Sequence, residues 1–179
     1  MKRGKDKIKY WVTTDLHLGH DKMKESGYRP SDFEIRIIMR HIEAISEQDV
    51  LICLGDVSFY YHEYWHYYFN FAVPCKKWLI RGNHDKHTDG WYLKHGWDFV
   101  SDFLVLKRYG YLMLFTHKPA YEDHYLMSPK VDWNPHGHVH NLDKSDRYDY
   151  SKNKTNRNIL VSLEQNNYRP VRLRILVGK

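Results

Sequence analysis

The chain has 179 residues, 42% of them hydrophobic, and a formal net charge of +6. This length is typical of one domain, here residues 1–179, and this hydrophobic content excludes a disordered chain. No apolar run approaches the roughly 20 residues that cross a bilayer, and the basic start leads into a strand pattern rather than a signal-peptide core. We therefore expect a soluble cytoplasmic protein without membrane contact.

Cysteine, charge and histidine content narrow the function classes further. The two cysteines, Cys53 and Cys75, provide neither a disulfide framework nor a CxxC zinc pattern. The modest positive charge is compatible with an anionic substrate or a nucleic acid, but it requires neither. The 13 histidines exceed what packing needs, so they are the more informative signal.

The first predicted elements are a strand and a long helix. The strand spans 8–14, which is rich in β-branched and aromatic residues. A helix is predicted over 31–49, where Ser31 and Glu34 form a capping box at its start. Its buried face is expected to consist of the apolar residues at helical spacing, which are Ile35, Ile38, Met39, Ile42 and Ile45.

The next predicted elements alternate strands and helices. A strand over 50–54 precedes a helix within 61–71, whose aromatic residues indicate core packing more than a stacking surface. A strand over 77–80 precedes a short helix over 89–96, which ends at a C-cap glycine. This alternation is typical of an α/β domain.

The remaining predicted strands lie in the second half of the chain. They span 99–107, 111–116, 158–163 and 171–177. In the last of these, apolar residues alternate with Arg172 and Arg174, the pattern of a sheet with one polar face. The segment 141–157 carries three Asp among five Lys and Arg, which predicts a charged surface loop near the site rather than a nucleic-acid clamp.

The segment 134–140, NPHGHVH, places three imidazoles within five residues. In an extended segment His136, His138 and His140 would project to the same side. A metal ion is the simplest partner for such a cluster, because neutral imidazole is the commonest metal ligand in proteins. A loop that is merely rich in histidine remains open from this segment alone.

Polar motifs follow the predicted strands at five places. They are Asp15-Leu16-His17, Gly55-Asp56, Gly82-Asn83-His84-Asp85, His117 and Gly137-His138-Val139-His140. The carboxyl ends of strands in an α/β sheet face a common crevice, so we expect these five loops to meet at one site.

This ordered set, DLH, GD, GNHD, a lone His and GHVH, resembles the calcineurin-like metallophosphoesterase superfamily over residues 15–140. The extended motifs DLHLGH, which includes His20, and NPHGHVH resemble small stand-alone members of that superfamily. The resemblance implies a four-layer αββα sandwich of two mixed β-sheets flanked by helices. It also implies a centre of two divalent metal ions.

The resemblance assigns ligands to both metal ions. It implies that the first ion is held by Asp15, His17 and His140, the second by Asn83, His117 and His138, and that Asp56 bridges the two together with a hydroxide. Carboxylate, amide and imidazole ligands without thiolate suit Mn²⁺, Fe, Zn²⁺ or Ni²⁺, and Mn²⁺ is our first choice.

Four further residues are candidates for contacts outside the ligand set. The resemblance implies that His84 protonates the leaving-group oxygen as a general acid, oriented by Asp85. His20, Arg29 and His136 are candidates for substrate phosphate contacts or for orienting ligands, with solvated polar residues as the alternative.

The resulting expectation is a dinuclear phosphoesterase that uses in-line attack of a metal-bridging hydroxide, with Asp56 and His84 as its catalytic residues. The protein-phosphatase branch continues its motif as GDxxDRG, whereas this chain reads GDVSFY, which disfavours phosphoprotein substrates. We expect a phosphodiesterase acting on nucleotides or nucleic-acid ends. The alternatives are a general phosphomonoesterase and, from a different class, a nucleic-acid-binding module with a structural zinc. The sequence does not identify the substrate or the oligomeric state.

Overall fold

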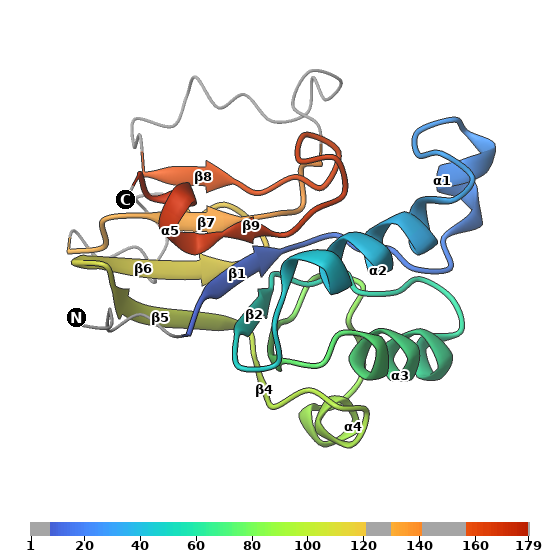
Figure 1. Cartoon of the computed structure of the whole chain (residues 1–179), viewed down its shortest axis with the longest axis horizontal. Coiled ribbons are helices and arrows are strands. Elements are labelled where there is room, and N and C mark those ends of the chain that lie inside the picture. The colour runs from blue at the N-terminus through green and yellow to red at the C-terminus, as the bar shows by residue number, and fades with distance from the viewer. Residues whose placement is uncertain (1–7, 121–129, 141–156, 179) are drawn as a thin grey trace, which may run out of the picture.

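The computed structural model describes residues 8–120, 130–140 and 157–178 (Figure 1). Its main sheet has five strands in the order β4-β3-β2-β1-β9. They are β1 (Tyr10–Thr13), β2 (Val50–Cys53), β3 (Lys76–Ile80), β4 (Phe99–Ser101) and β9 (Val171–Arg172). β1 to β4 are parallel and β9 pairs antiparallel with β1, so the sheet is mixed.

A second β-layer packs against this sheet. β5 (Phe103–Arg108) and β6 (Tyr111–Thr116) form an antiparallel hairpin, and β7 (Asn134–His136) pairs in parallel with β8 (Asn158–Leu160). A bridge between Met113 and Trp133 joins the two pairs, and β6 and β7 lie side by side in Figure 1. The segment 141–156, which contains nearly all of the predicted charged loop, lies outside the described residues.

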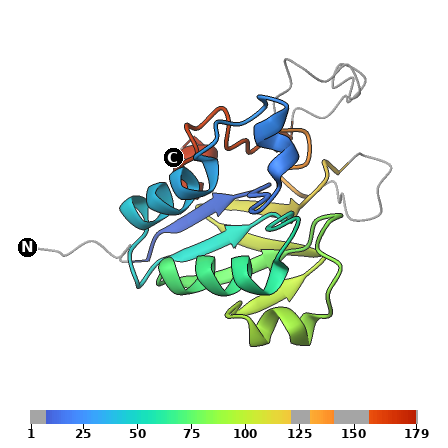
Figure 2. The ribbon, with the colours of Figure 1, turned by 90° about the vertical axis from the view of Figure 1, so that its right-hand side faces the viewer.

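The helices are α1 (Asp21–Glu25), α2 (Phe33–Ala44), α3 (His62–Ala72), α4 (Asp89–Lys94) and α5 (Leu173–Leu176). α2, α3 and α4 cover the face of the main sheet that points away from the second β-layer (Figure 2). The arrangement confirms the predicted mixed α/β class. Among the described segments, no helix combines the length and the apolar character needed to span a membrane.

The central strands bury both of their faces. In β2, Leu51 and Cys53 pack under the helices, while Val50 and Ile52 pack against the second β-layer. A parallel strand enclosed on both sides reads as a continuous apolar run, which is why VLIC was recognisable as a strand. The two cores hold the carboxyl ends of β1, β2 and β3 in fixed register.

The predicted buried face of α2 is wrong in most positions. The helix buries Phe33, Ile37 and Ile38, whereas Ile35 and Met39 are 69% and 50% exposed. The sequence carries two apolar stripes at helical spacing, and only one of them can face the sheet. The stripe that starts at Phe33 is chosen by the packing.

The predicted capping box of α2 is also absent. Asp32 is the N-cap residue and makes no side-chain cap bond. Glu34 instead forms an ion pair with Lys24, at 2.8 Å between Oε1 and Nζ. Glu34 thus pairs with Lys24 and does not cap the start of α2, which is the role that the local pattern predicted.

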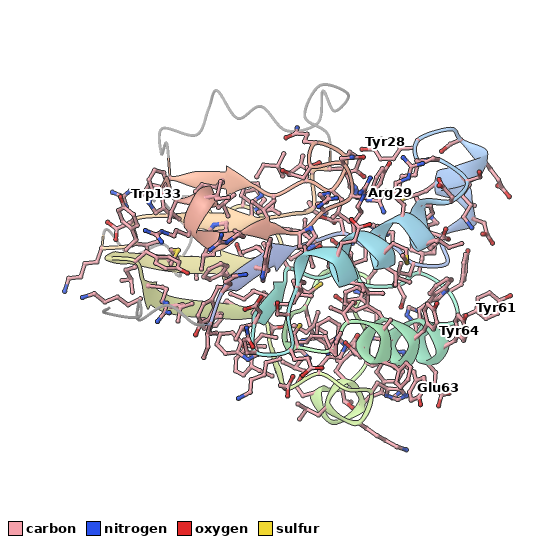
Figure 3. The ribbon with its side chains drawn as sticks, viewed as in Figure 1. Tyr28, Arg29, Tyr61, Glu63, Tyr64 and Trp133 are labelled. Carbon is pink, nitrogen blue, oxygen red and sulfur yellow. The ribbon has the colours of Figure 1, made fainter. Side chains whose placement is uncertain are left out.

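The aromatic residues of α3 are mostly on the surface. Only His66 and Phe69 are buried in this helix, and Tyr61 and Tyr64 point away from the molecule in Figure 3. The expectation of core packing is therefore wrong for most of the aromatic residues.

Two predicted strands differ in course from the structure, while the strand predicted over 158–163 is shorter and ends at Leu160. The segment 99–107 divides at Asp102 into β4 and β5, which belong to different layers. The segment 171–177 forms only the short strand β9, because β9 pairs with just Trp11 and Val12. The chain then turns into α5, which buries Leu173 and leaves Ile175 exposed.

Two fully buried histidines outside the predicted site make stability sensitive to acid. Burial lowers the pKa of His41 to about 4 and, together with the charges of neighbouring histidines, that of His66 to about 3. Unfolded histidines bind protons near pH 6.5, so unfolding takes up two protons between pH 6.5 and 4. The stabilising contribution of these two neutral histidines is present above pH 6.5. Below this pH the unfolding free energy falls by up to about 2.7 kcal/mol per pH unit.

We therefore expect these two histidines together to lower the unfolding free energy of the metal-free protein by about 3 kcal/mol between pH 6.5 and 5, since each is already half protonated in the unfolded chain at pH 6.5. Urea unfolding at several pH values measures this loss. His66→Gln should reduce the slope, because it removes one of the buried groups that take up a proton on unfolding. Equal stability at pH 6.5 and 5 would contradict the prediction.

Candidate metal centre

The five polar motifs meet where the strands end. In Figure 1 the arrowheads of β1 and β6 point to the same side of the molecule. Backbone hydrogen bonds join the loops there: the Asp15 N–H donates to the Gly55 carbonyl at 2.9 Å, and the Gly137 N–H donates to the His117 carbonyl at 2.9 Å. The His138 N–H also donates to the Asp15 carboxylate. The rule that strand ends share one crevice thus correctly predicted the convergence.

The side chains gather into two groups, each with its potential ligand atoms within 4.8 Å of one another. One group is Asp15, His17 and His140, and the other is Asp56, His117 and His138. Asn83 lies beside the second group, with Oδ1 3.0 Å from His117 Nε2. All seven predicted ligands are therefore brought together.

Asp56 lies between the two groups. Its Oδ2 is 3.4 Å from His117 Nε2 in one group and 3.7 Å from His17 Nε2 in the other. Its Oδ1 accepts a hydrogen bond from the His84 backbone N–H at 2.9 Å. One carboxylate oxygen is thus held by the protein, while the other faces both groups.

The donor atoms fit metal ions. Asp15 Oδ1 and both ring nitrogens of His17 are buried and have no hydrogen-bond partner among the described residues. The other Asp15 oxygen is held by the Thr14 hydroxyl and the His138 N–H, and His117 Nδ1 donates to the Leu54 carbonyl at 2.6 Å. Buried polar atoms are otherwise nearly always paired, and a second hydrogen bond commonly orients a metal ligand.

Glycine permits this close approach of the loops. A Cβ atom at Gly137 would collide with the Thr14 hydroxyl and the Asp15 carboxylate, and one at Gly82 would collide with the Asp56 carboxylate. These two glycines of the GHVH and GNHD motifs are required by space at the site.

The backbone is strained at five of the site residues. Their φ angles lie in the left-handed region, at 50° for Asp15, 49° for His17, 53° for Asp56, 71° for His138 and 50° for His140. Such conformations cost about 1–3 kcal/mol each and gather at functional sites. The fold therefore holds these five residues in unfavourable backbone conformations, which is typical of a functional site.

The same strain corrects the expectation for 134–140. β7 ends at His136, and the positive φ angles that follow turn His138 and His140 toward different groups. The three imidazoles therefore do not share one side of a strand.

In the second group, Asp56 and His117 shift the pKa of each other. Burial alone would raise the pKa of Asp56, but the hydrogen bond and charge of His117 lower it below its ordinary range. Burial alone would lower the pKa of His117, but Asp56 and Asp15 raise it to about 9. In the absence of an ion, a proton on His117 therefore balances the carboxylates.

A residue that the sequence did not reveal, Glu164, supports the first group. The His140 Nδ1 lies 3.3 Å from Glu164 Oε1, which leaves His140 Nε2 directed at Asp15 Oδ1, 3.7 Å away. A carboxylate on the far nitrogen orients a ligating imidazole and raises its basicity. Glu164 directly follows the predicted strand 158–163, so the strand-end rule could have identified it, although β8 itself ends at Leu160.

Arg29 contacts Glu164 and the DLH loop and is not accessible to a substrate. Its side chain is 0% exposed and lies 2.6 Å from Glu164, and it also donates to the carbonyls of Asp15 and Leu16. Its expected role as a phosphate contact is not supported by this burial. Arg29 instead holds the DLH loop and neutralises Glu164.

The two other candidate contacts differ from each other. His136 is fully buried, with Nδ1 3.0 Å from the Gly137 carbonyl, and burial lowers its pKa to about 4. It is therefore a core residue rather than a substrate contact. His20 is partly exposed and stacks on Phe59, with ring centroids 3.8 Å apart, so it remains a candidate.

His84 lies at the open side of the site. Its side chain is 39% exposed, and Nε2 is 4.0 Å from Asp56 Oδ2. Asp85 accepts hydrogen bonds from the backbone N–H groups of Asp56, Val57 and Gly82. The expectation that Asp85 orients the His84 ring is thus replaced by a structural role, in which Asp85 joins the GD and GNHD loops.

Replacing Glu164 with Gln should weaken both stability and metal affinity. Arg29 would lose the counterion of a fully buried charge, which costs about 3–5 kcal/mol, and His140 would lose its orienting carboxylate, which costs about 10–100-fold in metal affinity. Urea unfolding and chelator competition measure the two effects. Glu43→Gln is the control, since Glu43 pairs with Arg169 on the exposed surface. Equal metal affinity in both variants would contradict the assigned role.

Comparison with known proteins agrees with this geometry. The family model described as "Calcineurin-like phosphoesterase" matches residues 8–178. An uncharacterized protein of Methanocaldococcus jannaschii is 26% identical over 94% of this chain and 89% of its own length.

Solved structures also resemble this chain. A protein of unknown function from Aquifex aeolicus has a TM-score of 0.74 at 25% identity, covering 95% of this chain and 98% of that one. A nuclease of Pseudomonas putida has a TM-score of 0.47 at 21% identity, covering 73% and 61%. With the family model covering nearly the whole chain and two candidate metal-binding groups in place, the chain belongs to the calcineurin-like phosphoesterase family and is a metal-dependent phosphoesterase.

Proposed function

We propose that the protein is a dinuclear metal-dependent phosphodiesterase that acts on nucleotides or nucleic-acid ends. The observation that carries this proposal is the position of Asp56, whose Oδ2 faces His17 of one group and His117 of the other. A carboxylate shared by two ligand groups is suited to two ions with open positions. A structural zinc would instead need one closed set of four ligands.

The residues divide the work as follows. Asp15, His17 and His140 would hold one divalent ion, Asn83, His117 and His138 the other, and Asp56 both. When bound, such ions neutralise phosphate charge and lower the pKa of water. The oxygen and nitrogen donors suit Mn²⁺ first, with Fe, Zn²⁺ or Ni²⁺ as alternatives.

His84 is the proposed general acid. It projects from the loop that also carries Asn83, and its partial exposure leaves Nε2 accessible to a bound ester. An imidazolium at this place can give its proton to the departing alkoxide oxygen. Phe59 lies against the ring, with centroids 4.9 Å apart, and limits its orientations.

The charge of the site favours a diester over a monoester. Among the described residues, Arg29 is the arginine that contacts the candidate ligands, and its donors are used by Glu164 and two carbonyls. The second negative charge of a phosphomonoester would therefore lack a guanidinium partner, which is the group best suited to grip it. A diester carries a single charge that the two ions can neutralise.

A comparison of aryl esters tests this proposal. With Mn²⁺ present, kcat/KM for bis(p-nitrophenyl) phosphate should exceed that for p-nitrophenyl phosphate, and dinucleotides and oligonucleotides should be cleaved. Metal analysis should give two ions per chain. Preference for the monoester would favour the general phosphomonoesterase, and one ion without hydrolysis of any ester would favour the zinc-stabilised binding module.

A further inference from the structure

A second pair of histidines lies outside the ligand groups. His62 is the first residue of α3, after the loop that carries Asp56, and His87 follows His84 by three residues. Their ring centroids are 5.3 Å apart at an interplanar angle of 77°. The pair therefore spans the two loops that carry the proposed bridging carboxylate and the proposed general acid.

Both rings are held in place by neighbours. His62 Nδ1 is 2.8 Å from the buried hydroxyl of Ser58, and the His87 ring stacks on Trp91 at 3.9 Å and 14°. These contacts leave His62 Nε2 and both ring nitrogens of His87 without a hydrogen-bond partner among the described residues. Both side chains are partly exposed, and a neutral imidazole carries one N–H, so His62 Nε2 and one ring nitrogen of His87 can each donate to a ligand.

The pair adjoins the GD and GNHD motifs along the chain. Ser58, whose hydroxyl contacts His62, is the second residue after Asp56, and His87 is the third residue after His84, so the chain places both rings next to the motifs of the site. The neighbouring Lys86 is exposed and adds positive charge to the same loop. Imidazole N–H groups beside an ammonium form a good site for phosphate oxygens.

We propose that His62 and His87 bind a second phosphate group of the substrate, on the leaving-group side of the scissile phosphate. This inference rests on the proposed phosphodiesterase function and refines its substrate class. The preferred substrate would be an oligonucleotide or a phosphorylated dinucleotide rather than an ester with a single phosphate.

Binding is tested first, without turnover. The Zn²⁺-loaded protein is diamagnetic, so NMR can follow each histidine ring during titration with inorganic pyrophosphate. The signals of His62 and His87 should shift saturably, while that of His95 should not. His95 stacks on the other face of Trp91, at 3.8 Å, and pairs with Glu63, so it is the matched control. No saturable shift at His62 and His87 would overturn the proposal even if the enzyme cleaves diesters.

Kinetics then test selectivity. Dinucleotides with one bridging phosphate are compared with the same dinucleotides carrying an added 5′ or 3′ phosphate. The wild type should show about a tenfold lower KM for one of the phosphorylated forms, the gain expected from a charge-assisted hydrogen bond. His62→Gln and His87→Gln should each lose this preference, and His95→Gln should keep it.

The outcomes separate the two proposals. Preference retained in both His62→Gln and His87→Gln, or absent from the wild type, would overturn the second phosphate site. Failure to cleave any diester would overturn the proposed function, and the NMR titration would then decide the phosphate site alone. Using two variants guards against misfolding of one, since His87 contributes no buried hydrogen bond through its ring.

Discussion

Asp56→Asn should reduce kcat by at least about 10³-fold and lower the metal content of the protein. The substitution keeps the shape of the side chain but removes the charge between the two ligand groups. Two divalent ions would then face each other with less intervening negative charge, so their repulsion would increase. Metal analysis and steady-state kinetics on bis(p-nitrophenyl) phosphate, both at a fixed Mn²⁺ concentration, measure these effects.

Asp49→Asn provides the matched control for Asp56. Asp49 lies at the other end of β2 and is also buried, where it accepts hydrogen bonds from Lys9, Trp11 and Ser46. Its replacement should lower stability without changing metal content. An Asp56→Asn protein that keeps both ions and most of its activity would show that the carboxylate does not bridge.

His84→Asn should slow hydrolysis of an ester with a poor alkoxide leaving group by roughly 10²–10⁴-fold, with the metal content unchanged. An alkoxide, such as a ribose oxygen, develops charge that must be protonated in the transition state. A nitrophenolate leaves with little need for a proton, so an activated aryl ester should lose much less. The measurement is kcat/KM of wild type and variant on both ester types.

His20→Asn is the control for His84, because His20 contacts the same Phe59 ring from a stacked position. It should not produce the dependence on leaving group that His84→Asn produces. Equal losses of His84→Asn on the two esters would mean that this side chain positions phosphate or supports a metal ion instead.

The regular elements were predictable where local pattern and packing agree. β2 is enclosed on both faces, so its whole sequence is apolar, and the pattern alone identified it. The segment 171–177 alternates like a strand, but β9 has only two partners on β1 and the remainder forms α5. The alternation of residues along 171–177 gives no information on how much of the β1 edge is available for pairing.

The two apolar stripes of α2 show the same limit. Periodicity predicts a helix whichever stripe faces the sheet, and it does not by itself select the stripe with Phe33 over the stripe with Ile35. The choice depends on the shape of the sheet face below, to which residues from β2 and β3 contribute. The helix was therefore predictable, and its buried face was not.

The sequence by itself determined the polar motifs and the strand ends that they follow, because the carboxyl ends of strands in an α/β sheet share one crevice. The proposed ligand set came from the resemblance that these motifs carry. Only the tertiary structure decided which polar residues stay open to substrate. Arg29 and Glu164 are 135 positions apart, and their pairing buries a guanidinium that the sequence presented as free. Burial and charge pairing are properties of segments that meet in space, so no local pattern records them.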